Sequence, residues 1–536
     1  MLLILLTWLY MFFIFSVQGE YIRRIFFRNK LNSIGISVLL GMIFQAIAVT
    51  IAAFFYRIHI EYFCCNTALT VALFFLDKDR YIRQLRKNLR WSRLSLALFL
   101  LIAAASLMRS ALLPFLIDNE TYYIQTIKWL NEYGWVKGVA NLHLFLIHGS
   151  PWHALQAACN FPFLSGNFND INGFLICVMG FLWVDRLNGC RTKTACPADR
   201  WLFFVPLFSV LWFQFVDAPS VDLPLFLFTL LIIHCFLNRS AATDLLAIFL
   251  LVFLVFIKVS IAPILLLLFF LVSRKNIKTA LPYTLLLGLI YMVKSVWLSG
   301  CPFAPYTGFA LPLPWAFPQE ANFNYQFMII KDLFDFRHPA SNDFLDTALA
   351  VTVFSTTAIY GWTIRKEKAQ YPVFLFLVSD IAWVLSTAAN MRFILPAILY
   401  PLAYILSRNR IPLRFVSAAN CFFISLAFVP VFVPVDYSGW LKESAHLIKI
   451  DTFQPGYILK PAGISKHQAL TFKKTYFTNF HYYDPEDDFN FLFLTGNGPL
   501  PCVETSYLYQ MYRRTGYVPA LIGDDLGSGF YSVKIR

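Results

Sequence analysis

Residues 94–120 read LSLALFLLIAAASLMRSALLPFLIDNE, an apolar run that ends in Asp118, Asn119 and Glu120. The run is long enough to cross a bilayer as a helix, since about 20 residues at 1.5 Å each span the hydrocarbon core. Asp118 and Glu120 then emerge at the membrane surface. Carboxylates there are costly unless they are hydrated or used, so this stretch indicates the fold class and also a candidate site.

The composition of the whole chain matches this stretch. Of 536 residues, 58% are hydrophobic and 18% aromatic, and the mean hydropathy is +0.61. A soluble domain needs more polar surface than this. Ten cysteines show no CxxC pair and no regular spacing, which indicates neither zinc ligands nor a disulfide framework. The composition predicts a polytopic membrane protein.

Similar apolar runs recur along the chain and predict an all-α transmembrane domain over residues 1–434, with about 14 membrane helices. The first run lacks a basic start and a cleavage site, so we expect it to be a retained span rather than a signal peptide. Residues 243–273 contain Val259-Ser-Ile-Ala-Pro263 and form either one broken span or two. The predicted spans are residues 1–19, 33–56, 60–76, 94–117, 170–185, 201–216, 221–237, 243–258, 261–273, 279–297, 345–363, 371–388, 393–407 and 412–434.

Lysines and arginines gather in alternate loops, and this asymmetry predicts the topology. The loop at residues 77–93 is the most basic, and the rule that basic loops stay inside assigns it to the cytoplasm. Both termini, the loops 118–169 and 298–344, and residues 435–536 then face outward. The net charge of +14 therefore reflects anchoring to anionic lipid, and we expect the lipid bilayer, not nucleic acid, as the partner of these charges.

Residues 435–536 differ in composition, with polar residues, tyrosine and glycine throughout. We expect strands at Phe489–Leu494 and Gly529–Ile535 and a short helix at Thr505–Arg514. The region is predicted to form a small αβ extracytoplasmic cap.

Asp118 has two compatible interpretations. It can be the N-cap of an amphipathic helix over residues 121–133 that stops at Gly134. It can also be a general base that takes a proton from a sugar or protein hydroxyl as that oxygen attacks an anomeric carbon. Glu120 would then assist the base or bind the acceptor.

Three histidines, His143, His148 and His153, follow in the same outer loop. Their spacing fits no pair on one helical face, so no metal site is predicted, although a divalent cation and any other cofactor stay open. Hydrogen bonding to a substrate phosphate or hydroxyl and an ordinary loop role are the other interpretations. Ser150-Pro151 predicts the start of a second outer helix.

Basic residues at the outer ends of spans form the next group. Lys258, Lys294 and Arg392 either reach toward the membrane surface or collect around a lipid-linked phosphate, which Arg392 can grip with two hydrogen bonds. Arg109 and Asp380 lie within spans and are expected to be structural partners of other residues.

Further candidate substrate contacts lie in the outer loops. Asp217 and Asp222 bracket a short turn, where Asp222 can instead cap the next helix. Trp315 can stack on a sugar face or sit in the membrane interface. Asn141 lies in the loop that carries the histidines.

These motifs resemble a known group of enzymes. Carboxylates after an early span, followed by outer helices, resemble the GT-C-fold glycosyltransferases, such as protein O-mannosyltransferases, oligosaccharyltransferases and aminoarabinose transferases. More narrowly, the chain is similar to a poorly characterised family of bacterial membrane proteins of surface-polysaccharide assembly. That pattern has a basic residue and a glycine after Asn-Leu-His, where this chain has Phe145 and Ile147. The similar segments are Asp118, Tyr123–Trp129, Glu132–Gly134, Gly138–His143, Lys294–Phe303, Arg392-Phe393 and Gly498–Cys502.

The resemblance implies an inverting GT-C-like glycosyltransferase in a bacterial inner (cytoplasmic) membrane. It would move a sugar from a polyprenyl-phosphate donor to a glycan or glycolipid acceptor on the outer face. Asp118 and Glu120 would be catalytic. The donor phosphate would bind Arg392, Lys258, His143 and His148, and the substrate would contact Asn141, Asp217, Asp222, Lys294 and Trp315.

Two other functions stay open. An oligosaccharide-repeat polymerase would use arginines in outer loops, of which only Arg337 and Arg392 are candidates. A non-enzymatic transporter or flippase of lipid-linked glycans would bury ionisable groups near the bilayer centre and often has inverted repeats, and the sequence shows no internal repeat.

Overall fold

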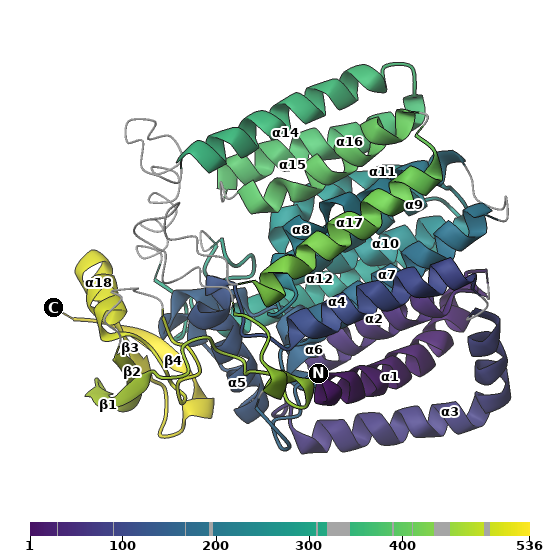
Figure 1. Ribbon diagram of the computed structural model, residues 1–536. Helices are drawn as coiled ribbons and strands as arrows, with labels where there is room; N and C mark the ends of the chain where they lie inside the picture. The colour runs from purple at the N-terminus through teal and green to yellow at the C-terminus, as the bar shows by residue number, and fades with distance from the viewer. Residues whose placement is uncertain are drawn as a thin grey trace.

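The computed structural model describes residues 1–28, 30–88, 91–166, 168–191, 197–306, 309–318, 343–387, 391–409, 411–433, 451–486 and 494–535. Within these ranges the chain is mostly helical, and eight helices are long and apolar enough to cross a membrane. A small region near the C-terminus holds two two-stranded sheets. The long helices form one body with this sheet region at one end (Figure 1).

Each predicted apolar run contains helical structure, although not over its whole length. The long apolar helices are α1 (Leu2–Phe27), α2 (Ile34–Ala52), α3 (Ile60–Asn88), α4 (Arg93–Ser110), α7 (Ile171–Arg191), α12 (Ile277–Ser299), α15 (Tyr371–Thr387) and α17 (Leu413–Phe432). The other runs form η4 (Pro197–Phe208), α8 (Ser209–Trp212), η5 (Phe213–Phe215), α9 (Asp222–Leu237), α10 (Ala241–Ile257), η6 (Val259–Leu267), α11 (Leu268–Leu271), α14 (Asp343–Thr363) and α16 (Leu395–Arg408).

Three boundaries differ from the sequence-based expectation. Helix α4 ends at Ser110 and not at Ile117, so residues 111–116 lead to Asp118 outside any helix. Residues 77–88 belong to α3, which bends at Asp77 (φ −143°, ψ 22°) instead of ending there. Residues 243–273 form two segments, because Lys258 is extended (φ −154°, ψ 121°) between α10 and η6. The break lets η6 fold back against α10 and pack against α15.

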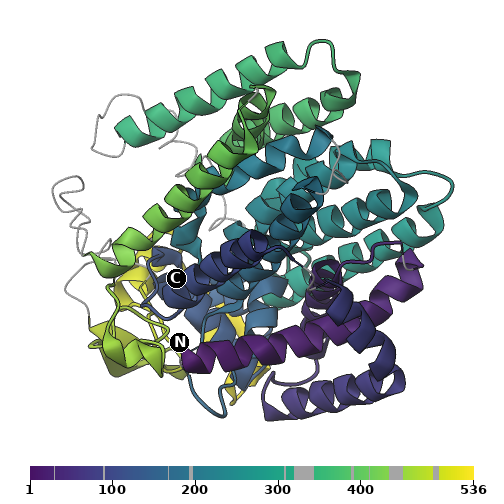
Figure 2. The same ribbon diagram turned by 45° about the vertical axis from the view of Figure 1, so that its right-hand side comes forward.

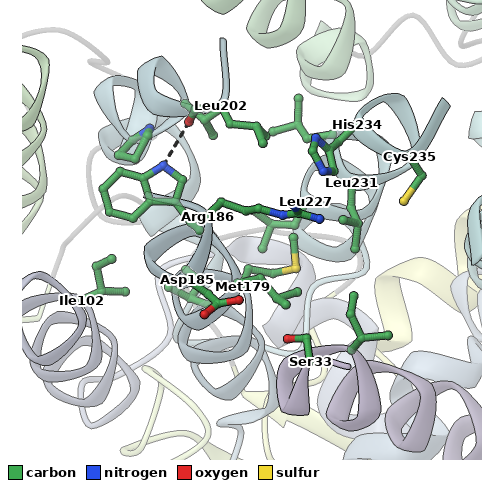
Figure 3. A pocket seen from close by; sticks show the side chains of 18 of the residues that line it. Ser33, Ile102, Met179, Asp185, Arg186, Leu202, Leu227, Leu231, His234 and Cys235 are labelled. Atoms are coloured by element: carbon green, nitrogen blue, oxygen red, sulfur yellow. Dashed lines mark hydrogen bonds between the residues drawn. The ribbon is translucent and has the colours of Figure 1, made fainter. Parts of the chain in front are cut away.

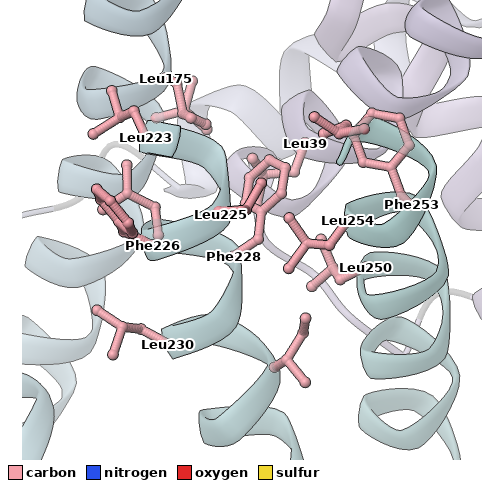
Figure 4. Packing of buried hydrophobic residues seen from close by; sticks show 14 of the residues in the cluster. Leu39, Leu175, Leu223, Leu225, Phe226, Phe228, Leu230, Leu250, Phe253 and Leu254 are labelled. Carbon is pink, nitrogen blue, oxygen red and sulfur yellow. The ribbon is translucent and has the colours of Figure 1, made fainter. Parts of the chain in front are cut away.

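The core lies around α9 and α10, which are apolar on all sides and therefore need burial on all sides. Phe228 of α9 and Leu250, Phe253 and Leu254 of α10 are fully buried and face one another (Figure 4). Helices at the perimeter instead present large apolar side chains outward, such as Phe75 of α3 (66% exposed) and Leu285 of α12 (63% exposed). Apolar surface of this kind suits contact with lipid.

Helices α1 and α2 cross very closely. A Cβ on Gly19 would lie 1.7 Å from the Ser37 carbonyl oxygen, and one on Gly41 would lie 2.0 Å from that of Phe15. Nearby, the amide groups of Gln18 and Gln45 both donate to Asn66 Oδ1 of α3. Small residues at a crossing and amides bonded between helices are typical of membrane helix packing.

Short helices cover one end of the body: η1 (Asn119–Tyr123), α5 (Ile124–Glu132), η2 (Val139–Asn141), η3 (Leu144–His148) and α6 (Pro151–Cys159). The prediction for α6 is confirmed, since Ser150 Oγ accepts a hydrogen bond from Trp152 N (3.2 Å) with Pro151 at the first position. Gly134 ends the α5 segment with φ 78°, where a Cβ would lie 2.3 Å from the Ala53 carbonyl oxygen.

The C-terminal region consists of β1 (Thr471–Phe477), β2 (Phe480–Glu486), α18 (Thr505–Thr515), β3 (Tyr517–Leu521) and β4 (Phe530–Lys534). The predicted α18 and β4 are confirmed, whereas residues 489–493 of the predicted strand lie outside the described residues. Strands β1 and β2 pair antiparallel around the turn Thr478-Asn479, and β3 pairs antiparallel with β4. The first hairpin escaped prediction although its asparagine-containing two-residue turn is a usable signal.

The body therefore has two distinct ends. The end with α5, α6 and the strands, here called the cap end, also holds the N-terminus, since Leu3 N donates to the Leu459 carbonyl oxygen (3.3 Å). At the opposite end, here called the far end, lie the connections after α1 and α9 (Figure 1). Helices α14 and α3 lie at opposite edges of the body in both views (Figures 1 and 2).

Candidate active site

Asp118 lies at the cap end, where the segment after α4 enters η1. It is half-buried and in helical conformation (φ −57°, ψ −26°), not in the extended conformation typical of a capping residue. The helix that follows begins as a π-helix, in which residues five apart are neighbours. Tyr123, five residues on, therefore brings its hydroxyl group to 3.5 Å from Asp118 Oδ2.

A polar chain continues from Tyr123 to a lysine. The Tyr123 hydroxyl also lies 3.5 Å from Ser220 Oγ, which in turn accepts a hydrogen bond from Asp222 N (3.3 Å). The Asp222 carboxylate is fully buried and forms an ion pair with Lys258 Nζ at 2.6 Å. The extended backbone at Lys258 places this side chain at the break between α10 and η6.

Lys258 also contacts the segment that contains Arg392. Its Nζ lies 3.7 Å from the centre of the Phe393 ring, in η8 (Met391–Ile394). The side chain of Arg392, the neighbour of Phe393, lies outside the described residues. Lys258 keeps 21% of its side chain exposed, whereas its partner Asp222 is fully buried.

His148 and His153 lie beside the tyrosines at the end of η1. The His153 ring packs against Tyr123 with 4.8 Å between ring centres, and Tyr122 lies about 6 Å from both histidine rings. Lys294 of α12 donates to the Gly149 carbonyl oxygen, next to His148. We call Asp118, Tyr123, His148, His153, Ser220, Asp222, Lys258 and Lys294 the polar cluster.

The histidines of this cluster are neutral at physiological pH. Loss of water, together with the cations Lys258 and Lys294, lowers the pKa of His148 to about 4. Burial and the same cations lower the pKa of His153 to about 3. Neutral imidazoles bind a phosphate through single hydrogen bonds and add no charge. The histidines therefore add no positive charge to the cluster, and its clearest cation is Lys258, which is paired with Asp222.

Glu120 occupies a different environment from Asp118. It is fully buried and accepts hydrogen bonds from Asn119 Nδ2 (3.0 Å), Ser465 Oγ (2.6 Å) and Lys466 N (3.1 Å). Its backbone oxygen accepts from Thr495 N and Gly496 N. Burial raises the pKa of Glu120, and these hydrogen bonds oppose that rise. Glu120 thus fastens η1 to two segments of the C-terminal region.

Asn141 and Trp315 form a second group apart from the polar cluster. Asn141 Nδ2 donates to the carbonyl oxygens of Gly138 and Trp315 (both 3.0 Å), and its Oδ1 accepts from Ser532 Oγ (2.7 Å). The Trp315 indole donates to the Val296 carbonyl oxygen (3.0 Å). Asn141 thus ties η2 to β4, and the Trp315 indole ties its own loop to α12 (Ile277–Ser299).

His143 and Asp217 also lie outside the polar cluster. His143 stacks on Tyr507 of α18, with 4.7 Å between ring centres, and burial lowers its pKa to about 3. Asp217 pairs with Arg109 at 2.6 Å, and both side chains are buried. Arg109 is therefore the structural partner that the sequence predicted.

In the described part of the chain, no group of three or more histidine, cysteine or acidic side chains is arranged to hold a metal ion. The basic atoms and the half-buried carboxylate of the polar cluster suit an anionic ligand and a proton transfer instead.

Comparison with known proteins adds a family. The sequence profile described as "Domain of unknown function (DUF8201)" matches residues 1–399. The chain belongs to this family. The matched part includes the whole polar cluster and ends before the C-terminal region. No curated protein and no solved structure matches the chain.

Sequence reasoning named five of the eight members of the polar cluster, and the structure brings these five together: Asp118, His148, Asp222, Lys258 and Lys294. It missed Tyr123 and Ser220 as site residues, and it noted His153 only as one of three histidines. A π-helical spacing of five residues was the available signal for Tyr123, because Asp118 stands five positions before it.

Proposed function

We propose that this protein is a membrane glycosyltransferase that moves a sugar from a polyprenyl-phosphate donor to a glycan or glycolipid acceptor in surface-polysaccharide assembly. The reaction would occur at the cap end, on the extracytoplasmic face of the membrane. The observation that carries the proposal is the polar chain from Asp118 through Tyr123 and Ser220 to Asp222 and Lys258.

In the proposed reaction Asp118 takes the proton of an acceptor hydroxyl while that oxygen attacks the anomeric carbon. A new carbon–oxygen bond forms as the bond from the anomeric carbon to the phosphate oxygen breaks. The electron pair leaves with the polyprenyl phosphate, and inversion at the anomeric carbon follows from attack on the opposite face. Lys258 and Arg392 would stabilise the departing phosphate.

The two carboxylates of the Asp-Asn-Glu motif then have different roles. Asp118 is half-buried and beside a hydroxyl group, so it can meet an acceptor. Glu120 is fully buried under the C-terminal region, and we assign it a positioning role. Tyr123 holds the Asp118 carboxylate from the adjacent turn.

Transfer by the purified full-length protein in nanodiscs tests the proposal. Polyprenyl-phosphate sugars with labelled sugar moieties are supplied with a lipid-linked oligosaccharide acceptor, and the labelled product is measured. Product formation that requires Asp118 supports the proposal. Failure across a panel of donor sugars and acceptors would remove it.

The topology has its own test. We propose about 14 spans with both termini outside. Single cysteines at Leu85 and in the cap region, in an otherwise cysteine-free chain, are treated with a membrane-impermeant maleimide in intact cells. We expect labelling only in the cap region. Labelling at position 85 from outside would show that the proposed topology is wrong.

One observation favours a second function, transport of lipid-linked glycans. Asp380 lies in α15, is fully buried, and neither of its carboxylate oxygens has a hydrogen-bond partner among the described residues. Buried ionisable groups inside spans mark ion or substrate paths in transporters. Asp380→Asn should leave sugar transfer intact if the protein is a transferase, whereas a transporter coupled through Asp380 loses its flux.

A further inference from the structure

A pocket of about 360 Å³ opens near the far end of the body, away from the polar cluster. Nine elements line it, which are the start of α2, α4, α7, η4, α8, η5, α9, α10 and α17. Its volume falls within the range of about 300–1,000 Å³ that small-ligand sites occupy. Figure 3 shows side chains from α7 and α9 facing each other across it.

The polarity of the pocket changes along its length. Asp185 and Arg186 of α7 line one part, and Met179 and Ile176 on the same helix line another. Ten residues of α-helix separate Ile176 from Arg186, so the lining extends over about 15 Å. A ligand that fills this space therefore needs a polar end and an elongated apolar part.

The polar part of the pocket carries a net positive charge, since Lys30 and Arg186 outnumber Asp185. Within the described residues, neither Lys30 nor Arg186 forms an ion pair, and both are exposed. The Arg186 side chain extends from α7 across the pocket toward Leu227 and His234 of α9 (Figure 3). Asp185 instead accepts a hydrogen bond from the Trp91 indole (3.4 Å). An anionic head group matches this arrangement.

The apolar part of the pocket is lined by aliphatic side chains. Leu227, Leu230 and Leu231 form its wall on α9, opposite Ile102 of α4 and Ile176 of α7. Hydrocarbon packed between such residues loses contact with water, and each buried methylene contributes about 0.8 kcal/mol. Saturated and isoprenoid chains both satisfy this requirement.

We propose that this pocket binds a lipid phosphate, with the phosphate at Lys30 and Arg186 and one hydrocarbon chain between α7 and α9. The lipid is either a phospholipid of the surrounding bilayer or a polyprenyl phosphate, which share this chemistry. The site lies apart from the polar cluster and does not depend on the transferase proposal.

Native mass spectrometry of the full-length protein in detergent tests this site. The probes are phosphatidylglycerol, a polyprenyl monophosphate and, as a comparison without a phosphate, diacylglycerol. We expect at least one anionic lipid to bind about tenfold or more tightly than diacylglycerol, since charge-assisted hydrogen bonds are worth about 1.5–3 kcal/mol. The tighter-binding of the two anionic lipids shows whether the ligand is a bilayer phospholipid or a polyprenyl phosphate. Equal binding of all three overturns the proposal.

Three variants locate the lipid. Arg186→Gln removes the head-group contact, Leu231→Trp fills the apolar part of the pocket, and Arg274→Gln removes an exposed arginine that does not line the pocket. We expect the first two to lower anionic lipid affinity about tenfold and the control to keep it. Wild-type affinity in either Arg186→Gln or Leu231→Trp overturns the proposal. If Leu231→Trp fails to fold, Lys30→Gln replaces it, because Lys30 is exposed.

Discussion

The two ends of this molecule use charge in opposite ways. At the cap end, Lys258 is neutralised by the buried Asp222, and the histidines beside it are uncharged. At the far end, Arg186 extends into an open pocket without an ion-pair partner among the described residues. The first arrangement fixes the position of a charge that is already paired, as the proposed reaction needs, whereas the second leaves a charge without an ion pair and available to a ligand.

This difference also separates the functional proposals. A change in the polar cluster should alter chemistry without altering lipid binding at the far end. A change in the pocket should do the reverse. Coupled losses in both assays would show that the two regions act as one site.

The largest expected effect comes from Asp118→Asn. The amide keeps the shape but cannot accept the proton, so transfer should fall by about 10²–10⁴. Lipid binding at the far-end pocket should stay at the wild-type level. Sugar transfer from the labelled donor and lipid binding by native mass spectrometry are measured on the same preparation. Asp185→Asn, a matched change in the pocket, is the control and should keep wild-type transfer. Full transfer activity in Asp118→Asn would show that Asp118 is not the general base.

The Lys258–Asp222 pair should show the next largest effect. Lys258→Gln leaves a fully buried carboxylate without its ion pair, a loss that costs about 3–5 kcal/mol of unfolding free energy. The double variant Lys258→Gln/Asp222→Asn should recover most of this stability and still bind the donor about tenfold more weakly.

The pair Arg239–Asp244, also at 2.6 Å but with an exposed arginine, supplies the control for Lys258. Arg239→Gln should cost at most about 1 kcal/mol, since exposed pairs contribute little. Thermal unfolding and the donor concentration at half-maximal transfer are the measurements. If the double variant has wild-type donor affinity, Lys258 is only structural.

Donor affinity in Arg392 variants separates phosphate binding from a membrane-anchoring role. Arg392→Lys keeps the charge but loses the planar fork, so it should weaken donor binding nearly as much as Arg392→Gln. Anchoring by any long cation instead predicts that Arg392→Lys behaves like the wild type. Unchanged donor affinity in both variants would remove Arg392 from the site.

Glu120→Gln should affect the attachment of the C-terminal region more than the reaction. Loss of the carboxylate weakens three hydrogen bonds to Asn119, Ser465 and Lys466, at a cost of about 1–3 kcal/mol. Limited proteolysis should then cut the C-terminal region sooner, while the protein that remains intact keeps its transfer rate. The exposed Glu132 provides the control, Glu132→Gln, which should resist cleavage as the wild type does. A loss of transfer with an intact C-terminal region would assign Glu120 to the chemistry.

Near neutral pH, the smallest effect comes from the protonation of His153. His153 has a pKa of about 3 in the folded protein and an ordinary value near 6.5 when unfolded, so the unfolded chain binds more protons between these values. Stability is therefore fully present above about pH 6.5 and falls as the pH drops, by about 1.4 kcal/mol per pH unit for one histidine. His153→Phe keeps a ring against Tyr123 and should reduce this slope by one proton in thermal unfolding series. An unchanged slope would mean that His153 is already protonated or exposed.

The sequence by itself determined the helical segments, because hydrophobic runs of bilayer length are a local property of the chain. It also determined α6 with its Ser150 cap, α18 and the last strand, which depend on residues close in sequence. The bend at Asp77 was not predicted, because the charged residues that continue α3 read as a loop.

Only the tertiary structure decided which polar residues act together. Asp222 and Lys258 are 36 residues apart, and Glu120 and Ser465 are 345 apart, so their pairing depends on how the helices and the C-terminal region pack. Packing alone also distinguishes the half-buried Asp118 from the buried Glu120, two residues away. The far-end pocket arises in the same way, since its walls come from nine elements and no local pattern in the sequence encodes the space between them.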